Sequence, residues 1–414
     1  MSSKNKRIVA VVLMIVLIIL AIPALNVAQY PLRPDANGEV VVYADLKTIS
    51  NHGNVPLKND SWFLQLAMKR AGIEIGDTAQ VRFLDKVMEL PVVENYSEVR
   101  AEENLIRLHM NKMEISTNLG DFASTYFADE ITKDDGSYTW VYKEGVEGPV
   151  SFHISLCEKG GAKTVSGLSY TDMRSDYPNL TDEQFANFRM VRTTGIGEGT
   201  LYRTCSPVDP GRSRNTYADA AIRNAGVRTI VNLADTREIV EAFPGYADSY
   251  YSSTDYIGLN MGISPKTEDF KTKLAQGLRF FAEHEGPYAF HCLEGKDRTG
   301  IVAALLECYM GASLEEVESD YMVTFYNYFG VEPGSELYED LVNNNIVSML
   351  RSLLGTKDLE KADLSKLAES YFRSIGLTDT ELAALWANLS RSWAETDAAP
   401  EAAPETPESL PAAA

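Results

Sequence analysis

The segment Tyr288-Ala-Phe-His-Cys-Leu-Glu-Gly-Lys-Asp-Arg-Thr-Gly-Ile-Val302 decides how the second half of this 414-residue chain can fold. An apolar strand ends at His291, a polar loop follows, and an apolar helix begins near Thr299. A loop between a strand end and a helix start turns backbone N–H groups inward, and the helix adds the positive end of its dipole. Gly295 permits the tight turn that brings the backbone close to a ligand. The segment therefore predicts a cradle for a phosphate dianion.

The side chains of this loop suit phosphoryl transfer. Aligned amides and Arg298 would favour the thiolate of Cys292, which could then attack phosphorus. Arg298 lies six residues further on and offers a planar fork for two phosphoryl oxygens. We expect His291 to fix the loop by hydrogen bonds and the Thr299 hydroxyl to stabilise the thiolate as it leaves a phosphoenzyme. The remaining phosphate-binding positions are Leu293, Glu294, Gly295 and Lys296.

The pattern His-Cys-x5-Arg-Thr-Gly resembles the signature of the protein tyrosine phosphatase superfamily. Its form here, His291 to Gly300, is similar to the bacterial group whose loop reads Gly-Lys-Asp-Arg-Thr-Gly. Two upstream blocks, Leu201-Tyr-Arg-Thr-Cys-Ser-Pro207 and Gly226-Val-Arg-Thr-Ile-Val-Asn-Leu-Ala-Asp-Thr-Arg-Glu238, match further motifs of that group in the same order. The resemblance implies a metal-independent hydrolase that works through a cysteinyl phosphate, so we expect no cofactor and no metal.

The residue that protonates the leaving oxygen is less well defined. Such a reaction needs an acid, and the group's Asp-Leu-Arg triplet is replaced here by Asn232-Leu-Ala, followed by Asp235. Asp297 matches the loop aspartate of the group and is the first choice. Asp235, at a strand end on the same side of the sheet, and Asp255 are the alternatives. Asp297 would otherwise only hold the loop, by pairing with backbone amides or Arg237.

The substrate also stays open. Members of the group act on phosphotyrosine, and some act on phosphoserine, phosphothreonine or phosphoinositides. Lys296 could contact a second phosphate, whereas Glu294 beside it would discourage polyanions. We therefore favour phosphotyrosine, with inositol polyphosphates or phosphoinositides as the alternative. An inactive fold that only captures phospho-ligands is the alternative of another class.

Around this loop, strands alternate with helices. Residues 201–204 and 228–233 predict strands, and residues 217–225, 267–284 and 299–309 predict helices. This alternation indicates an α/β cysteine-phosphatase fold over residues 182–394, with a mainly parallel central sheet flanked by helices. Residues 30–181 show short alternating apolar runs with frequent turns, which predict a β-rich accessory domain with one helix near residues 60–71.

The two ends of the chain differ from the middle. Lys4, Lys6 and Arg7 precede an apolar run over residues 8–21, which predicts a signal anchor or signal peptide in residues 1–29. The catalytic domain would then be membrane-anchored or secreted, outside the cytoplasm of a bacterial-type cell. Residues 395–414 are mostly Ala, Pro and Glu and predict a disordered tail.

The net charge and the cysteine content exclude several classes of partner and site. The net charge of −21 disfavours nucleic acid as a partner, because nucleic-acid binding needs clustered Lys and Arg. The four cysteines match no zinc-binding spacing and do not form a disulfide framework. The phosphate loop and its resemblance imply phosphorylated proteins or small phosphoesters as partners, together with the membrane through the N-terminal segment.

Overall fold

The computed structural model describes residues 34–57, 62–109, 112–133, 138–162 and 168–393. Within these residues the chain forms two compact units. The first contains the chain up to Ser169 together with Gly262–Phe270 and Val331–Ser352. The second contains Tyr170–Met261, Lys271–Gly330 and the described chain from Leu353 onward. The predicted anchor (residues 1–29) and tail (residues 395–414) lie outside the described residues, and no helix of the described part is long and apolar enough to cross a membrane.

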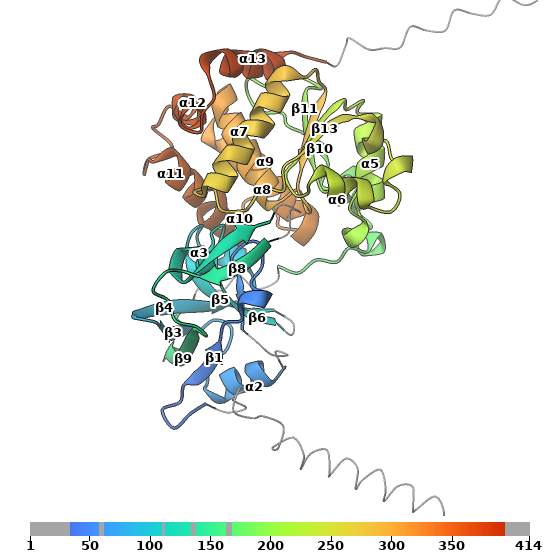
Figure 1. Cartoon of the computed structure of the whole chain (residues 1–414). Helices are drawn as coiled ribbons and strands as arrows, with labels where there is room; N and C mark the ends of the chain where they lie inside the picture. The colour runs from blue at the N-terminus through green and yellow to red at the C-terminus, as the bar shows by residue number, and fades with distance from the viewer. Residues whose placement is uncertain (1–33, 58–61, 110–111, 134–137, 163–167, 394–414) are drawn as a thin grey trace, which may run out of the picture. The chain divides into compact units, whose positions relative to one another are not determined.

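The first unit is built on β-strands, as the sequence predicts (Figure 1). Its seven-stranded sheet has the order β1-β9-β3-β4-β5-β6-β2, and β7 pairs with β8 separately. The strands are β1 (Val40–Tyr43), β2 (Val55–Pro56), β3 (Thr78–Phe83), β4 (Lys86–Val93), β5 (Asn104–His109), β6 (Lys112–Thr117), β7 (Ala128–Thr132), β8 (Tyr138–Tyr142) and β9 (Ser151–Glu158). Alternate residues of β3, namely Ala79, Val81 and Phe83, are buried, because strand side chains alternate between the two faces. The helices are α2 (Trp62–Arg70) and α3 (Phe122–Tyr126).

A later part of the chain completes this first unit. It comprises α10 (Glu336–Val342), a π-helical turn η9 (Asn343–Val347) and most of α11 (Ser348–Leu354). The buried Asn345 side chain donates to the carbonyl oxygens of Ser97 (3.3 Å) and Leu341 (2.9 Å). The amide of Ala101 donates to the Asn344 carbonyl at 2.8 Å. Residues more than two hundred positions apart are therefore hydrogen-bonded within one compact unit.

The second unit contains a five-stranded sheet in the order β10-β11-β14-β12-β13. The strands are β10 (Arg189–Met190), β11 (Leu201–Thr204), β12 (Thr229–Asn232), β13 (Asp255–Gly258) and β14 (Tyr288–His291). All pairings are parallel except β10 with β11. Every residue of the central strands β12 and β14 is buried, which is typical of parallel strands covered on both faces. The predicted mainly parallel sheet is confirmed.

Helices surround this sheet (Figure 1). They are α4 (Asp182–Phe185), α5 (Asn215–Asn224), α6 (Arg237–Ala242), α7 (Glu268–Glu283), α8 (Asp297–Met310), α9 (Leu314–Phe329), α12 (Leu364–Ser374) and α13 (Asp379–Ser390). Helix α8 is central, since every residue from Thr299 to Met310 is buried. It begins two residues earlier than predicted. The sequence also predicts a helix over residues 359–375, whereas α12 begins at Leu364. Asp363 sets that later start, because its side chain caps the helix by accepting from the Lys366 amide at 3.1 Å.

Candidate active site

The loop that follows β14 leaves the sheet at the carboxyl edge of its central strands. His291, the last residue of β14, is in register with Thr204 of β11 and Asn232 of β12. The segments that leave β11 and β12 therefore lie on either side of the loop. In α/β sheets, this edge is where ligands bind.

The backbone carbonyls of residues 291–296 are all engaged by hydrogen-bond donors. The donors are Leu233 N to His291 O (2.8 Å), His291 Nδ1 to Cys292 O (3.2 Å), Ser206 N to Leu293 O (3.0 Å), Tyr328 Oη to Glu294 O (2.9 Å), Arg203 Nη2 to Gly295 O (3.2 Å) and Gly300 N to Lys296 O (2.8 Å). A trans peptide holds its C=O and N–H on opposite sides. With the carbonyls held by surrounding groups, the amides of the loop face the opposite side, toward its interior.

Three of the loop amides stand out. Within the described residues, the N–H groups of Leu293, Glu294 and Gly295 donate to no acceptor. The first amides of α8 also lack intrahelical acceptors, and its N-cap, Lys296, supplies no side-chain cap. The loop and the helix start thus form a nest of unsatisfied donors around Cys292. An anion such as phosphate is the ligand that such a nest accepts.

His291 ties the loop to the neighbouring segment η8 (Tyr251–Ser253). Its ring is fully buried, with Nε2 3.2 Å from the Tyr251 hydroxyl and Nδ1 3.2 Å from the Cys292 carbonyl oxygen. The carbonyl can only accept, so Nδ1 carries the proton and Nε2 accepts from Tyr251. Burial, assisted by the nearby Arg298, lowers the pKa of His291 to about 4. The imidazole is therefore neutral at pH 7.

Cys292, Arg298 and Thr299 come together at this site. Cys292 is buried, with 4% of its surface exposed. Arg298 donates through Nη1 to the carbonyls of Met261 (3.1 Å) and Leu233 (3.3 Å), which fixes one nitrogen of its fork. The hydroxyl of Thr299 is buried and has no hydrogen-bond partner among the described residues.

Of the three candidate acids, two lie at the loop. Asp297 pairs with Lys296 at 3.6 Å, and burial raises the pKa of its carboxyl, with Lys296 opposing the shift and Glu294 adding to it. Burial also raises the pKa of Asp235, which follows β12 at the same edge. Asp255 lies elsewhere, because it begins β13 and is in register with Thr229, at the amino edge of the sheet.

If Asp297 only held the loop, its expected partners were backbone amides or Arg237. Arg237 instead pairs with Glu241 at 3.2 Å and donates to the Tyr256 carbonyl at 2.8 Å. The partner of Asp297 is therefore Lys296, its neighbour in the loop.

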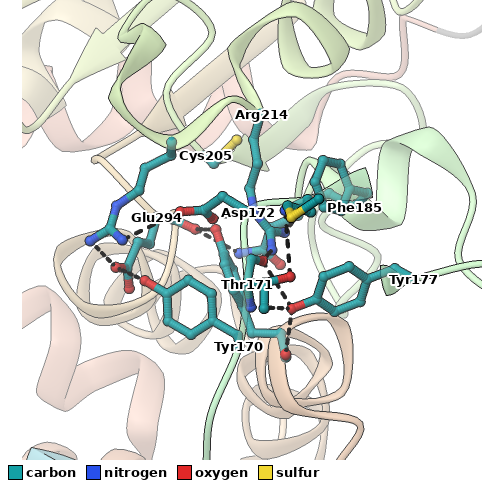
Figure 2. Close-up of polar contacts among 12 residues, drawn as sticks. Tyr170, Thr171, Asp172, Tyr177, Phe185, Cys205, Arg214 and Glu294 are labelled. Carbon is teal, nitrogen blue, oxygen red and sulfur yellow. Dashed lines mark hydrogen bonds and ion pairs between the residues drawn. The ribbon is translucent and has the colours of Figure 1, made fainter. Parts of the chain in front are cut away.

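Glu294 belongs to a polar network that sequence reasoning missed (Figure 2). Its carboxylate accepts from the Tyr170 hydroxyl and pairs with Arg212 at 2.9 Å. Asp172 in turn pairs with Arg212 (3.5 Å) and Arg214 (2.9 Å). Although burial alone would raise it, the pKa of Glu294 is held below its usual range by Lys296, Tyr170 and Arg212. The negative charge of Glu294 is thus compensated before any ligand binds.

Arg214 anchors this network through Asp172. It is fully buried, donates to the carbonyls of Phe185 and Thr171, and lies over the rings of Phe185 (4.1 Å) and Tyr328 (4.3 Å). Figure 2 shows Tyr170, Thr171, Asp172 and Tyr177 gathered near Arg214. The sequence feature that could have indicated this network is the high Tyr and Arg content of residues 170–177 and 212–214. Arg203, which holds the Gly295 carbonyl, already lay within the quoted Leu-Tyr-Arg block.

Comparison with known families identifies this arrangement. The model of a tyrosine phosphatase family matches residues 184–391, which include the Cys292 loop and the strands beside it. The chain belongs to this tyrosine phosphatase family. It is accordingly a hydrolase of the protein-tyrosine-phosphatase type, and its cysteine-based chemistry follows from that membership.

Solved structures that resemble the chain are more distant. TpbA from P. aeruginosa, crystallised with phosphotyrosine, is 17% identical over 48% of this chain and 98% of its own, with a TM-score of 0.28. The catalytic core of the PP-IP phosphatase SIW14 from S. cerevisiae is 18% identical over 38% and 83%, with a TM-score of 0.24. An uncharacterised conserved protein from Thermotoga maritima is 19% identical over 30% of this chain, which spans 38% of that protein, with a TM-score of 0.22. No curated protein matches the chain.

Proposed function

We propose that the chain hydrolyses phosphomonoesters through a covalent phosphate on Cys292. The observation that carries this proposal is the loop at Cys292, in which the backbone carbonyls are engaged while the amides of Leu293, Glu294 and Gly295 have no acceptor among the described residues. A phosphate dianion would receive the inward N–H groups and the free part of the Arg298 fork. The Cys292 thiolate would then attack in line, forming an S–P bond as the P–O bond to the leaving group breaks.

Asp297 is the proposed acid for the leaving oxygen, with Asp235 as the alternative. Its raised pKa favours the protonated form that a general acid needs, and it sits at the start of α8 beside Arg298. In the second step, water attacks phosphorus and the S–P bond breaks. The unpartnered Thr299 hydroxyl is free to donate to the departing thiolate. The neutral His291 holds the loop and does not exchange protons in this scheme.

Phosphotyrosine in proteins is the substrate we propose, with dual specificity as its extension. The cations near the loop are already paired, Arg212 with Glu294 and Asp172, and Lys296 with Asp297. Little surplus positive charge is left for a second phosphate group. Lys296 nevertheless keeps inositol polyphosphates or phosphoinositides as the alternative substrates, because its pairing with Asp297 spans 3.6 Å and could be exchanged for a phosphate.

We also propose that the enzyme acts outside the cytoplasm at the membrane. The support is the basic and apolar sequence of residues 4–21. Protease added to intact spheroplasts should digest the catalytic unit if this is right. Digestion only after lysis would contradict it.

The deciding experiment is hydrolysis of p-nitrophenyl phosphate by the full chain in EDTA. Cys292→Ser should lose turnover by roughly 10⁴-fold or more, because the hydroxyl is a far weaker nucleophile. Cys157→Ser, at the exposed cysteine of the first unit, is the matched control and should keep full activity. Full activity in Cys292→Ser would refute the mechanism. Phosphate binding without turnover in the wild type would indicate the capture module instead.

A further inference from the structure

Asn187 is a fully buried residue that touches two consecutive peptides of the phosphate loop. It lies between α4 and β10 with a left-handed backbone (φ 52°). Its Nδ2 donates to the carbonyl oxygens of Glu294 (3.1 Å) and Gly295 (3.2 Å), and to the Thr324 hydroxyl (3.3 Å). No other side chain among the described residues is seen to bridge these two carbonyls.

The orientation of this carboxamide is fixed by donors on its other side. Its Oδ1 accepts from Arg189 Nη1 (2.9 Å) and Asn327 Nδ2 (3.1 Å). Arg189 can only donate, so Oδ1 must face it and Nδ2 must face the loop. Arg189 is itself held by Asp320 at 2.9 Å. A reversed amide would set oxygen against two carbonyls, and the surrounding groups prevent that.

The two peptides that Asn187 holds lie on either side of Gly295. Gly295 has φ 69° and no Cβ, so its flanking peptide planes meet little steric resistance to rotation. A flip of either plane would replace an inward N–H by an inward carbonyl oxygen. That oxygen would repel phosphate, so a clamp on these carbonyls maintains the anion site.

We propose that Asn187 is a positioning residue that keeps the Gly295 and Lys296 amides directed at the phosphoryl group. The inference rests on the proposed function and goes beyond it by assigning a residue that does not touch the substrate. Tyr328 and Arg203 give each carbonyl a second donor, so loss of Asn187 weakens the site without abolishing it.

The test uses the full chain with two substitutions. Asn187→Asp keeps the shape and replaces the donor by a carboxylate. Asn187→Gly removes the carboxamide while suiting the left-handed backbone, so it should fold even if the first does not. Asn345→Asp is the matched control, because Asn345 is buried and also clamps two backbone carbonyls, but in the first unit.

The readouts are kinetics with p-nitrophenyl phosphate and inhibition by orthovanadate. Both Asn187 variants should lose roughly 10- to 100-fold in kcat/KM, with a parallel rise in the vanadate inhibition constant. Asn345→Asp should lower the melting temperature and leave the vanadate constant unchanged. A folded Asn187→Gly variant with wild-type vanadate inhibition would overturn the inference.

Failure of the proposed function gives a different result. In that case the wild type itself shows no turnover, and calorimetric binding of inorganic phosphate replaces the kinetic readout. Weaker phosphate binding by Asn187→Gly would still support the positioning role. Equal binding by wild type and variant, or no binding by either, would overturn it.

Discussion

The buried, neutral imidazole of His291 holds the phosphate loop, and it makes the free energy of unfolding decrease at low pH. Its folded pKa is about 4, below the ordinary value of 6.5. Between these values the unfolded chain binds more protons, so the free energy of unfolding falls as pH drops from 7 to 4. This residue alone should remove about 3 kcal/mol over that range.

Urea denaturation at pH 7 and pH 5 checks this expectation. The drop in stability between the two should be smaller in His291→Asn than in the wild type, because the variant lacks the titrating ring. Other groups, including Asp297 and Asp235, are common to both proteins and cancel in the comparison. An identical drop in both proteins would show that His291 does not titrate as described.

Asp297 and Asp235 are separated by their dependence on the leaving group. Asp297→Asn should slow phenyl phosphate hydrolysis roughly 100-fold and p-nitrophenyl phosphate hydrolysis much less, since nitrophenolate leaves without a proton. The wild-type rate should fall as pH rises through the raised pKa of this acid, and that limb should vanish in the variant. Asp235→Asn is the paired measurement. A leaving-group effect in Asp235→Asn alone would transfer the role to Asp235.

At the level of single elements, Gly295 controls how the loop lies against β11. A Cβ built there would lie 2.3 Å from the Thr204 carbonyl oxygen and 2.8 Å from the Cys205 nitrogen, both backbone atoms. Gly295→Ala should therefore cost roughly 2 kcal/mol or more and remove most activity. Gly330→Ala, with nearly the same φ (67°) and nothing within 4 Å, isolates the backbone penalty of about 1 kcal/mol. Equal thermal shifts in the two variants would contradict the close contact.

Helices and strands with strong apolar patterns could be predicted from the sequence. The ends of elements that begin or end in polar residues could not. Strand β11 was predicted to the residue, because residues 201–204 stand between turn residues. The start of α8 was placed at Thr299, since Asp297 and Arg298 are as polar as the loop before them. Their helical conformation depends on the tertiary contacts of the loop carbonyls, which local sequence does not encode.

The prediction of the site was limited in the same way, because contacts between distant parts of the chain are not encoded in local sequence. Cys292, Arg298 and Thr299 share one short motif and were assigned together. Asn187 contacts a loop more than one hundred residues further along the chain, and the sequence alone does not state that pairing.

For the whole molecule, the chain segments that make up the first unit determine where the chain can be cut into separately folding fragments. Sequence patterns predict domains only as continuous stretches of chain, whereas this unit also includes Gly262–Phe270 and Val331–Ser352. Asn345 and Ser352 there bind Ser97 and Glu102. Leu341 and Ile346 of the same segment are buried and belong to this first unit.

A fragment of residues 170–393 should therefore be less stable than one of residues 34–393. In the shorter fragment, the apolar side chains of residues 331–352 lack the early segment of their unit and become exposed. We therefore expect aggregation or a melting temperature lower by several degrees. Size-exclusion chromatography and thermal unfolding of both fragments measure the difference. A monomeric short fragment with an unchanged melting temperature would show that these residues are stable without their early partners.

This interleaving also imposes an order on biosynthesis. Ser97, Ala101 and Glu102 leave the ribosome some 250 residues before Asn344, Asn345 and Ser352, their partners in the folded chain. The first unit can be completed only when most of the polypeptide has been made. The hydrogen bonds that join Ser97 and Glu102 to Asn345 and Ser352 can therefore form only after the late segment has been synthesised.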